Sequence, residues 1–237
     1  MDTPLEVQIG KYLLAHRWTL AVAESCTGGL IGHRITNVPG SSAYYLGSVT
    51  AYAYEAKVQL LGVSWATLER YGAVSGETVL AMARGIRSAL NADVGLSVSG
   101  IAGPGGGMKN KPVGLTWFGI SAPDYENTWR FIWHGDRIAN KNQSAEKALE
   151  LLVEFLMERQ METIEVTARF DKDGLITPLE VVKDGVHYRV ESTGRRWQGK
   201  SGEHILVMIV GNRVMHLLFN FGERKWYFVG GNTQAIT

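Results

Sequence analysis

Ser25 stands where an apolar segment gives way to small and polar residues, in the motif AESCTGG of residues 23–29. The apolar segment predicts a buried strand, and its carboxyl end lies at the rim of a sheet, where open α/β folds bind ligands. Backbone amides at the start of the following helix stabilise anions. Ser25 is therefore a candidate nucleophile for a carbonyl group, with nearby N–H groups to hold the oxyanion. By itself the motif favours a simpler interpretation, in which Ser25 only caps the helix.

A serine nucleophile needs a base, because its hydroxyl is inert at neutral pH. No Gly-x-Ser-x-Gly elbow surrounds Ser25, and none of the six histidines has a convincing partner by spacing. Lys57 lies where a strand expected to end at Tyr52 turns into a helix, and burial lowers a lysine pKa enough for it to accept a proton. The local sequence favours another interpretation, a solvated Lys57 paired with Glu55 or another carboxylate.

A glycine-rich loop, SGIAGPGGG at residues 99–107, is a second candidate for ligand contact. Its unhindered backbone amides can approach and cradle a phosphate. The loop matches neither the P-loop pattern nor the glycine fingerprint of a dinucleotide fold. A flexible connection without function explains the same composition.

Alternating helical and strand patterns surround these candidates and predict a layered α/β/α domain with a mixed sheet. Thr3 followed by Pro4 predicts the start of the first helix. We expect helices near residues 5–14, 55–63, 75–91 and 137–159, and a tight turn that leads into a helix within residues 26–38. We expect strands near residues 19–25, 43–52, 93–99, 113–121 and 127–135.

Beyond Arg159 the helical pattern stops, which places a domain boundary between residues 1–159 and 160–237. Four apolar segments with Asp-Gly and Gly-Asn turn signals predict successive antiparallel strands of a small all-β domain. They are residues 168–181, 184–193, 204–220 and 225–231. This region mixes cationic and aromatic residues, which fits strand aromatics packed in a small core better than a nucleic-acid site. Those residues are Arg195, Arg196, Trp197, Lys225, Trp226 and Tyr227.

The composition is that of an ordinary globular protein, with 45% hydrophobic residues and 20% charged residues. A formal net charge of +1 provides no global attraction to nucleic acid or to an anionic membrane. Cys26 is the single cysteine, which excludes an intramolecular disulfide and a multi-cysteine zinc site and favours a reducing compartment. The N-terminus does not have the pattern of a signal peptide, and no segment is apolar enough to span a bilayer. We expect a cytoplasmic protein.

Taken together, the motifs resemble the C-terminal domain family of the competence/damage-inducible protein CinA, from about Leu5 to Leu156. They occur in the family's order and at similar spacing. The motifs are AESCTGG at 23–29, NVPGSSAYYLGSVTAY at 37–52 with EAKVQLLGV at 55–63, YGAVSGETVLAMARG at 71–85, SGIAGPGGG at 99–107 with KPVG at 111–114, and GDR at 135–137.

The resemblance implies an amidohydrolase that converts nicotinamide mononucleotide and water to nicotinate mononucleotide and ammonia, without a metal or an organic cofactor. The family's catalytic serine, tyrosine and lysine fall on Ser25, Tyr52 and Lys57. In that scheme Ser25 attacks the carboxamide carbon, Lys57 takes the proton of the Ser25 hydroxyl, and Tyr52 orients Ser25 and Lys57. A homodimer is also implied, with no membrane partner. The implied substrate contacts are Cys26, Thr27, Gly28, Gly100, Ala102, Gly103, Gly105, Arg137 and Lys141, with the amides of Cys26 and Thr27 as oxyanion donors.

Three residues depart from the family pattern. Ala53 and Tyr54 stand where members usually have Ser-Asn, which removes a side-chain amide. Lys141 replaces a common arginine, which keeps the charge but loses the bidentate guanidinium. These departures bear on substrate affinity more than on the chemistry. They also leave open a non-catalytic nucleotide-binding or scaffold protein of the same fold, whose β domain recruits a partner.

Overall fold

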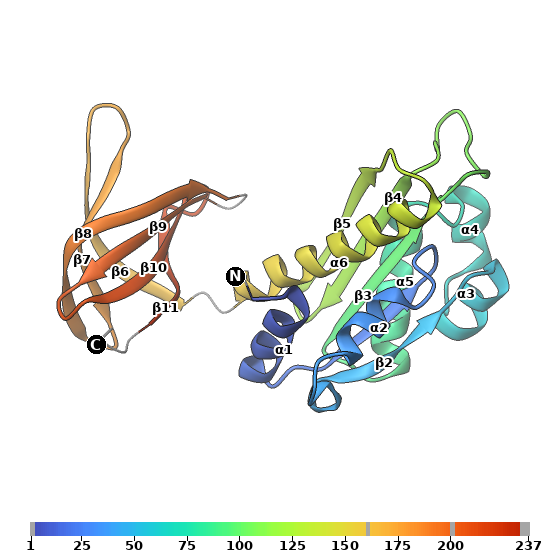
Figure 1. Cartoon of the computed structure of the whole chain (residues 1–237), viewed down its shortest axis with the longest axis horizontal. Helices are drawn as coiled ribbons and strands as arrows, with labels where there is room; N and C mark the ends of the chain where they lie inside the picture. Colours follow the sequence, from blue (N-terminus) through green and yellow to red (C-terminus); the bar gives the residue numbers. More distant parts are fainter. Residues whose placement is uncertain (1–2, 160–161, 200–201, 233–237) are drawn as a thin grey trace. The chain divides into compact units, whose positions relative to one another are not determined.

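The chain divides into two compact units, Met1–Leu156 and Met157–Thr237 (Figure 1). The computed structural model describes residues 3–159, 162–199 and 202–232. The first unit combines a five-stranded sheet with helices, and the second is a closed barrel. The predicted fold class, a layered domain with a mixed sheet followed by a small antiparallel all-β domain, is confirmed.

The sheet of the first unit is mixed, in the order β2-β1-β3-β4-β5. β1 lies between β2 and β3 and runs parallel to both, whereas β4 and β5 are antiparallel additions. Every residue of β1 is buried, as expected of a parallel strand covered on both faces. The strands are β1 (Leu20–Glu24), β2 (Tyr45–Thr50), β3 (Val94–Gly100), β4 (Leu115–Ala122) and β5 (Tyr125–Ile132).

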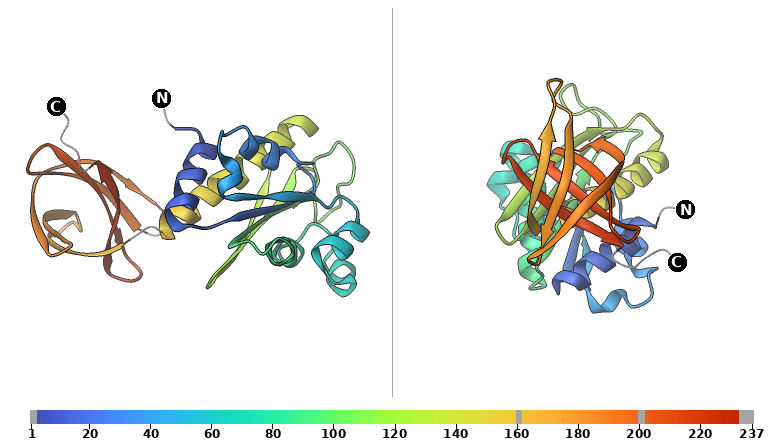
Figure 2. Two further views of the ribbon diagram at one scale, coloured as in Figure 1. Left: turned by 90° about the horizontal axis from the view of Figure 1, so that it is seen from below. Right: turned by 90° about the vertical axis from the view of Figure 1, so that its left-hand side faces the viewer.

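Helices cover both faces of this sheet, with α1, α2 and α6 on one face and α3, α4 and α5 on the other (Figures 1 and 2). The buried side chains of β1 and of α3, α4 and α5 form one continuous apolar core. The helices are α1 (Leu5–His16), α2 (Leu30–Thr36), α3 (Tyr54–Leu61), α4 (Trp65–Tyr71), α5 (Gly76–Ala89) and α6 (Arg137–Arg159), with a short 3-10 helix η1 (Ser41–Ala43).

Two helix starts differ from the sequence predictions. Thr3 does not cap α1, because Pro4 itself occupies the N-cap position and no side chain bonds to the first turn. α4 was not expected, although Ser64 caps it by accepting a hydrogen bond from the backbone N–H of Thr67. With only seven residues, α4 shows too little helical periodicity to be recognised.

The second unit is a closed barrel of six antiparallel strands, each paired with its neighbours along the chain, with β11 closing on β6. Two of the four segments expected to be strands are hairpins instead, with turns near residues 171–175 and 210–212. The predicted turn signals lay inside these segments, so the number of strands was underestimated. The strands are β6 (Glu162–Phe170), β7 (Ile176–Lys183), β8 (Val186–Gln198), β9 (Gly202–Ile209), β10 (Arg213–Asn220) and β11 (Lys225–Asn232).

Within the described ranges, no helix combines the length and the apolar character that crossing a bilayer requires.

Gly85 lets α5 pack directly against the end of α3, since a Cβ at this position would lie 1.9 Å from the carbonyl oxygen of Leu61. We expect Gly85→Ala to lower the free energy of unfolding by roughly 1–3 kcal/mol through overpacking, although alanine is the better helix former by about 1 kcal/mol. Urea unfolding followed by circular dichroism measures the change. Gly105→Ala is the control, because its Cβ would meet open space. A Gly85→Ala protein as stable as the wild type contradicts the close packing.

Candidate active site

Ser25 follows the last residue of the interior strand β1, at the carboxyl edge of the sheet. Its backbone N–H donates to the carbonyl of Val98 on β3 at 3.0 Å, which fixes it beside the neighbouring strand. The helix α2 begins at Leu30, and Gly29 is its N-cap. The simpler interpretation, in which Ser25 only caps a helix, is therefore wrong. Its hydroxyl is available for another role.

The turn that follows Ser25 is organised by Glu24, a buried carboxylate that the sequence analysis did not single out. Its two oxygens accept hydrogen bonds from the hydroxyl of Thr27 at 2.7 Å and from the backbone N–H groups of Gly29, Ile31 and Gly32 at 2.9–3.1 Å. These bonds satisfy backbone donors at the start of α2. A charged residue at the end of an otherwise apolar strand is the signal that would have identified it.

Two glycines give this turn its shape. Gly28 and Gly29 have φ values of 68° and 95°, in the left-handed region that glycine enters without steric cost. The chain therefore reverses tightly between β1 and α2. This reversal leaves Ser25 and Cys26 at the edge of the sheet.

Lys57 approaches Ser25 from α3 and is completely buried, with an exposed fraction of 0%. Its Nζ donates to the hydroxyl of Ser25 at 3.1 Å, to the carbonyl of Ala51 at 2.7 Å and to the carbonyl of Tyr52 at 3.2 Å. The solvated Lys57 that its local sequence favours is therefore wrong. The chain between β2 and α3 wraps around the amine and supplies both carbonyls.

Burial lowers the pKa of Lys57 to about 8, because the charged form loses its hydration. At pH 7 about a tenth of the amine is therefore neutral, and this fraction rises as the pH approaches 8. In the neutral form two N–H bonds can remain on the carbonyls of Ala51 and Tyr52, and the lone pair then faces the hydroxyl of Ser25. This is the arrangement that a general base for a serine requires.

Cys26 is not a competing nucleophile. Burial raises the pKa of its thiol to about 12, although hydrogen bonds from the backbone N–H groups of Cys26 and Thr27 act in the opposite direction. The thiol is protonated at neutral pH and a thiolate is the reactive form. The same two N–H groups, next to Ser25, are the ones that the resemblance assigns to the oxyanion.

Tyr52 contacts the lysine through its backbone, while its side chain is 60% exposed. The Tyr52 hydroxyl accepts a hydrogen bond from Arg137 Nη2 at 3.0 Å. Arg137 also donates through Nη1 to the carbonyl of Gly103 at 2.7 Å. Arg137 therefore ties the Tyr52 ring to the glycine-rich loop at the mouth of the site.

A cavity of about 190 Å³ opens over Ser25 and Lys57. Three of its residues, Ala73, Val74 and Ser99, were not predicted as site residues, although they lie in two of the quoted motifs. Gly105 and Gly103 do not line it, although the Gly103 carbonyl holds Arg137. The lining residues are Ser25, Cys26, Tyr52, Lys57, Ala73, Val74, Ser99, Gly100, Ala102 and Arg137.

Glycine is required at position 100 in this cavity wall. A Cβ there would lie 2.6 Å from the hydroxyl of Thr116, 2.8 Å from the carbonyl of Leu115 and 3.1 Å from the sulfur of Cys26. The adjoining wall is held by buried Asn140, whose side-chain amide donates to the carbonyl of Ala102 at 3.0 Å. Close packing behind the wall therefore determines its shape.

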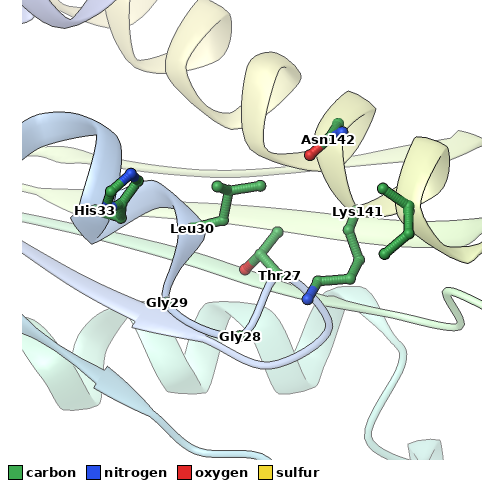
Figure 3. A pocket seen from close by; sticks show the side chains of 8 residues that line it. Thr27, Gly28, Gly29, Leu30, His33, Lys141 and Asn142 are labelled. Carbon is green, nitrogen blue, oxygen red and sulfur yellow. The ribbon is translucent and has the colours of Figure 1, made fainter.

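Three predicted substrate contacts, Thr27, Gly28 and Lys141, line a second cavity of about 330 Å³ beside the first (Figure 3). The Lys141 amine reaches from α6 toward the turn, so that a Cβ on Gly28 would lie 3.6 Å from it. The Thr27 hydroxyl donates a hydrogen bond to the carboxylate of Glu24. The turn of residues 25–29 thus contributes to both cavities. The other lining residues are Gly29, Leu30, His33, Ile138 and Asn142.

In the second unit the structure pairs two histidines for which spacing indicated no partner. His204 Nδ1 and His216 Nε2 lie 2.9 Å apart across neighbouring strands. Burial lowers the pKa of His216 to about 4, with His204 contributing, and burial also lowers the pKa of His204. Both imidazoles are therefore neutral at pH 7.

The cationic and aromatic residues of the second unit have separate surroundings. Trp226 is buried in the barrel core, as expected for strand aromatics. Arg196 pairs with Glu203 and also donates to the carbonyl of Ile176. Tyr227 donates to Glu223. Contacts within the barrel unit therefore explain the positions of Trp226, Arg196 and Tyr227, three of the six residues, and no nucleic acid is needed to explain them.

Comparison with known proteins identifies the first unit. A family model described as the CinA C-terminal domain matches residues 2–156. The CinA-like protein of Salinibacter ruber is 50% identical over 149 residues, which are 63% of this chain and 36% of that protein. The chain thus spans little more than a third of the length of this curated relative.

Solved structures agree with this match. A competence-damaged protein (CinA) superfamily protein from Klebsiella pneumoniae is 34% identical, with a TM-score of 0.63, covering 65% of this chain and 96% of that chain. A superfamily protein from Escherichia coli is 29% identical, with a TM-score of 0.61, covering 64% of this chain and 90% of that chain. The family model ends at residue 156, so the barrel unit lies outside it.

The buried position of Lys57 predicts an unusual titration. We expect its amine to titrate at about 8 in the folded protein, whereas exposed lysines titrate above about 10. Nuclear magnetic resonance of protein with carbon-13 in the lysine Cε measures each pKa, and the signal missing in Lys57→Met assigns the residue. A Lys57 signal that titrates with the exposed lysines contradicts the buried amine.

Proposed function

The chain belongs to the CinA C-terminal domain family over residues 2–156, and we propose that it is an amidohydrolase that deamidates nicotinamide mononucleotide. The observation that carries this proposal is the 3.1 Å contact between the buried Lys57 amine and the Ser25 hydroxyl. A serine with a lysine base is an established solution for acyl transfer. The substrate itself comes from the resemblance of the motifs and is the part that an assay must decide.

The proposed reaction has two halves. Ser25 Oγ bonds to the carboxamide carbon while its proton passes to Lys57 Nζ, and the backbone N–H groups of Cys26 and Thr27 hold the oxyanion. The C–N bond then breaks, and the departing ammonia takes the proton from Lys57. Water, deprotonated by the same amine, attacks the acyl-serine. The bond between the acyl carbon and Ser25 Oγ breaks, Lys57 returns its proton to Ser25 Oγ, and nicotinate mononucleotide is released.

The rest of the nucleotide needs contacts away from the reacting carbon. Arg137 lies at the mouth of the first cavity, and Lys141 lies in the second, next to the shared turn. Both side chains are cations, and a phosphate is the substrate group that pairs with them. We assign substrate binding to Arg137 and Lys141, together with the backbone of Gly28, Gly100 and Ala102.

The proposal includes a homodimer as the form that carries the activity.

Loss of the Ser25 hydroxyl should abolish the reaction. We expect the wild type to release ammonia from nicotinamide mononucleotide, and Ser25→Ala to reduce the rate by about 10³-fold or more. A coupled ammonia assay measures the rate, with nicotinamide as the substrate control. Ser88→Ala, at an exposed serine of α5, should leave the rate unchanged. A folded wild type that binds the nucleotide and never releases ammonia overturns the proposal and favours a non-catalytic binding protein.

The Tyr52 ring and the Tyr52 carbonyl can be separated by mutation. Tyr52→Phe removes the hydroxyl held by Arg137 but keeps the carbonyl held by Lys57, so kcat should change by less than about threefold. Lys57→Met should lower kcat by about 10²-fold or more, because the base is lost. Steady-state kinetics measure both, with Tyr12→Phe on α1 as the control. A loss for Tyr52→Phe as large as that for Lys57→Met would show that the hydroxyl orients the pair.

A further inference from the structure

The barrel unit has a cavity of about 520 Å³ at one end. Consecutive antiparallel strands place the β6–β7 and β10–β11 turns at the same end, and they are neighbours because β11 pairs with β6 (Figure 1). The mouth of a β-barrel is a common position for a ligand, and the volume lies in the usual range of about 300–1,000 Å³. The cavity is lined by Phe170, Phe219, Phe221, Arg224 and Trp226.

Aromatic rings make most of this lining. Phe219 lies in the middle of the lining. Its ring centroid is 5.8 Å from that of Phe170 and 5.6 Å from that of Phe221, both in edge-to-face contacts, and 5.0 Å from that of Trp226. Trp226 is only 8% exposed and belongs to the core, so it forms a fixed floor. Phe170 and Phe221 are 57% and 49% exposed and form the rim. Two large apolar rings left in water above a buried one are a feature of binding sites, because their burial would be favourable.

Both turns that carry the rim are held in place. The carboxylate of Asp171 accepts hydrogen bonds from the backbone N–H groups of Asp173 and Leu175 in the β6–β7 turn. The side-chain oxygen of Asn220 accepts one from the backbone of Glu223 in the β10–β11 turn, at 3.0 Å. Such turns keep the rings in position before a ligand arrives, which lowers the entropy cost of binding.

The lining carries one charge, the guanidinium of Arg224. The neighbouring carboxylate of Glu223 is engaged by the hydroxyl of Tyr227 and lies 3.9 Å from Lys225 Nζ. Within the described part of the chain, no carboxylate lies in salt-bridge range of Arg224. A guanidinium beside exposed aromatic rings suits an anion that also has a flat apolar body.

We propose that the mouth of the barrel binds a small organic anion, with an aromatic body against the Phe170 and Phe221 rings and a carboxylate, sulfonate or phosphate on Arg224. The site belongs entirely to the second unit, so it does not depend on the chemistry proposed for Ser25. It gives the barrel a ligand-binding function. Single-stranded nucleic acids need a cationic groove that follows the phosphate backbone, whereas this lining has one cation, Arg224, which favours a small acid.

Two fluorescent probes of similar shape and different charge test this proposal on the full chain. They are 8-anilino-1-naphthalenesulfonate, an anion, and N-phenyl-1-naphthylamine, which is neutral. We expect Arg224→Gln to weaken binding of the anion about tenfold and to leave the neutral probe unchanged. Phe221→Ala should weaken both probes, because it removes one wall of the cavity. Neither substitution would change the affinity of a probe that bound to the first unit.

Matched controls keep the test specific. Arg189→Gln removes an exposed arginine of β8, and Val186→Ala removes an exposed apolar side chain at the opposite end of the barrel. Neither should change the affinity for either probe. The proposal is overturned if the anionic probe does not bind at about 1 mM, or if it binds equally well to Arg224→Gln and the wild type. Binding of a single-stranded oligonucleotide in place of the anion also overturns it.

Discussion

The contact between the Lys57 amine and the Ser25 hydroxyl is the interaction on which the proposed chemistry depends. A buried lysine is costly unless each of its donors is satisfied, and here two backbone carbonyls and one hydroxyl satisfy them. The same burial lowers the pKa of the amine, so that the energetic cost and the capacity to accept a proton have one cause. The chain between β2 and α3 must therefore keep its course for the site to exist.

Glu24 and Ser25 show how the end of one strand serves two purposes. Successive side chains of a strand point to opposite faces of the sheet. Glu24 bonds to the first turn of α2 on one face, and Ser25 meets Lys57 of α3, which lies on the other face (Figure 2). The carboxylate fixes the turn, and the turn holds the hydroxyl and the adjacent amides at the edge of the sheet.

The two units divide the molecule by chemistry as well as by structure. The first carries the family motifs and both cavities around the turn of residues 25–29. The barrel unit buries an aromatic and aliphatic core, but leaves two phenylalanine rings and an arginine at one mouth. The proposed catalysis and the proposed binding of a small anion therefore belong to different units of the chain.

The sequence by itself determined the layered fold, most helices and strands, and the family, because periodicity and turn residues act over a few positions. It also indicated Ser25 and Lys57 as candidates, although their local surroundings favoured a helix cap and a solvated lysine. Only the tertiary structure decided that these side chains meet, since they lie 32 positions apart and the burial of Lys57 depends on chain packed around it. The role of Glu24, the separate cavity of Lys141 and the aromatic mouth of the barrel likewise arise from strand and helix packing, which local patterns do not record.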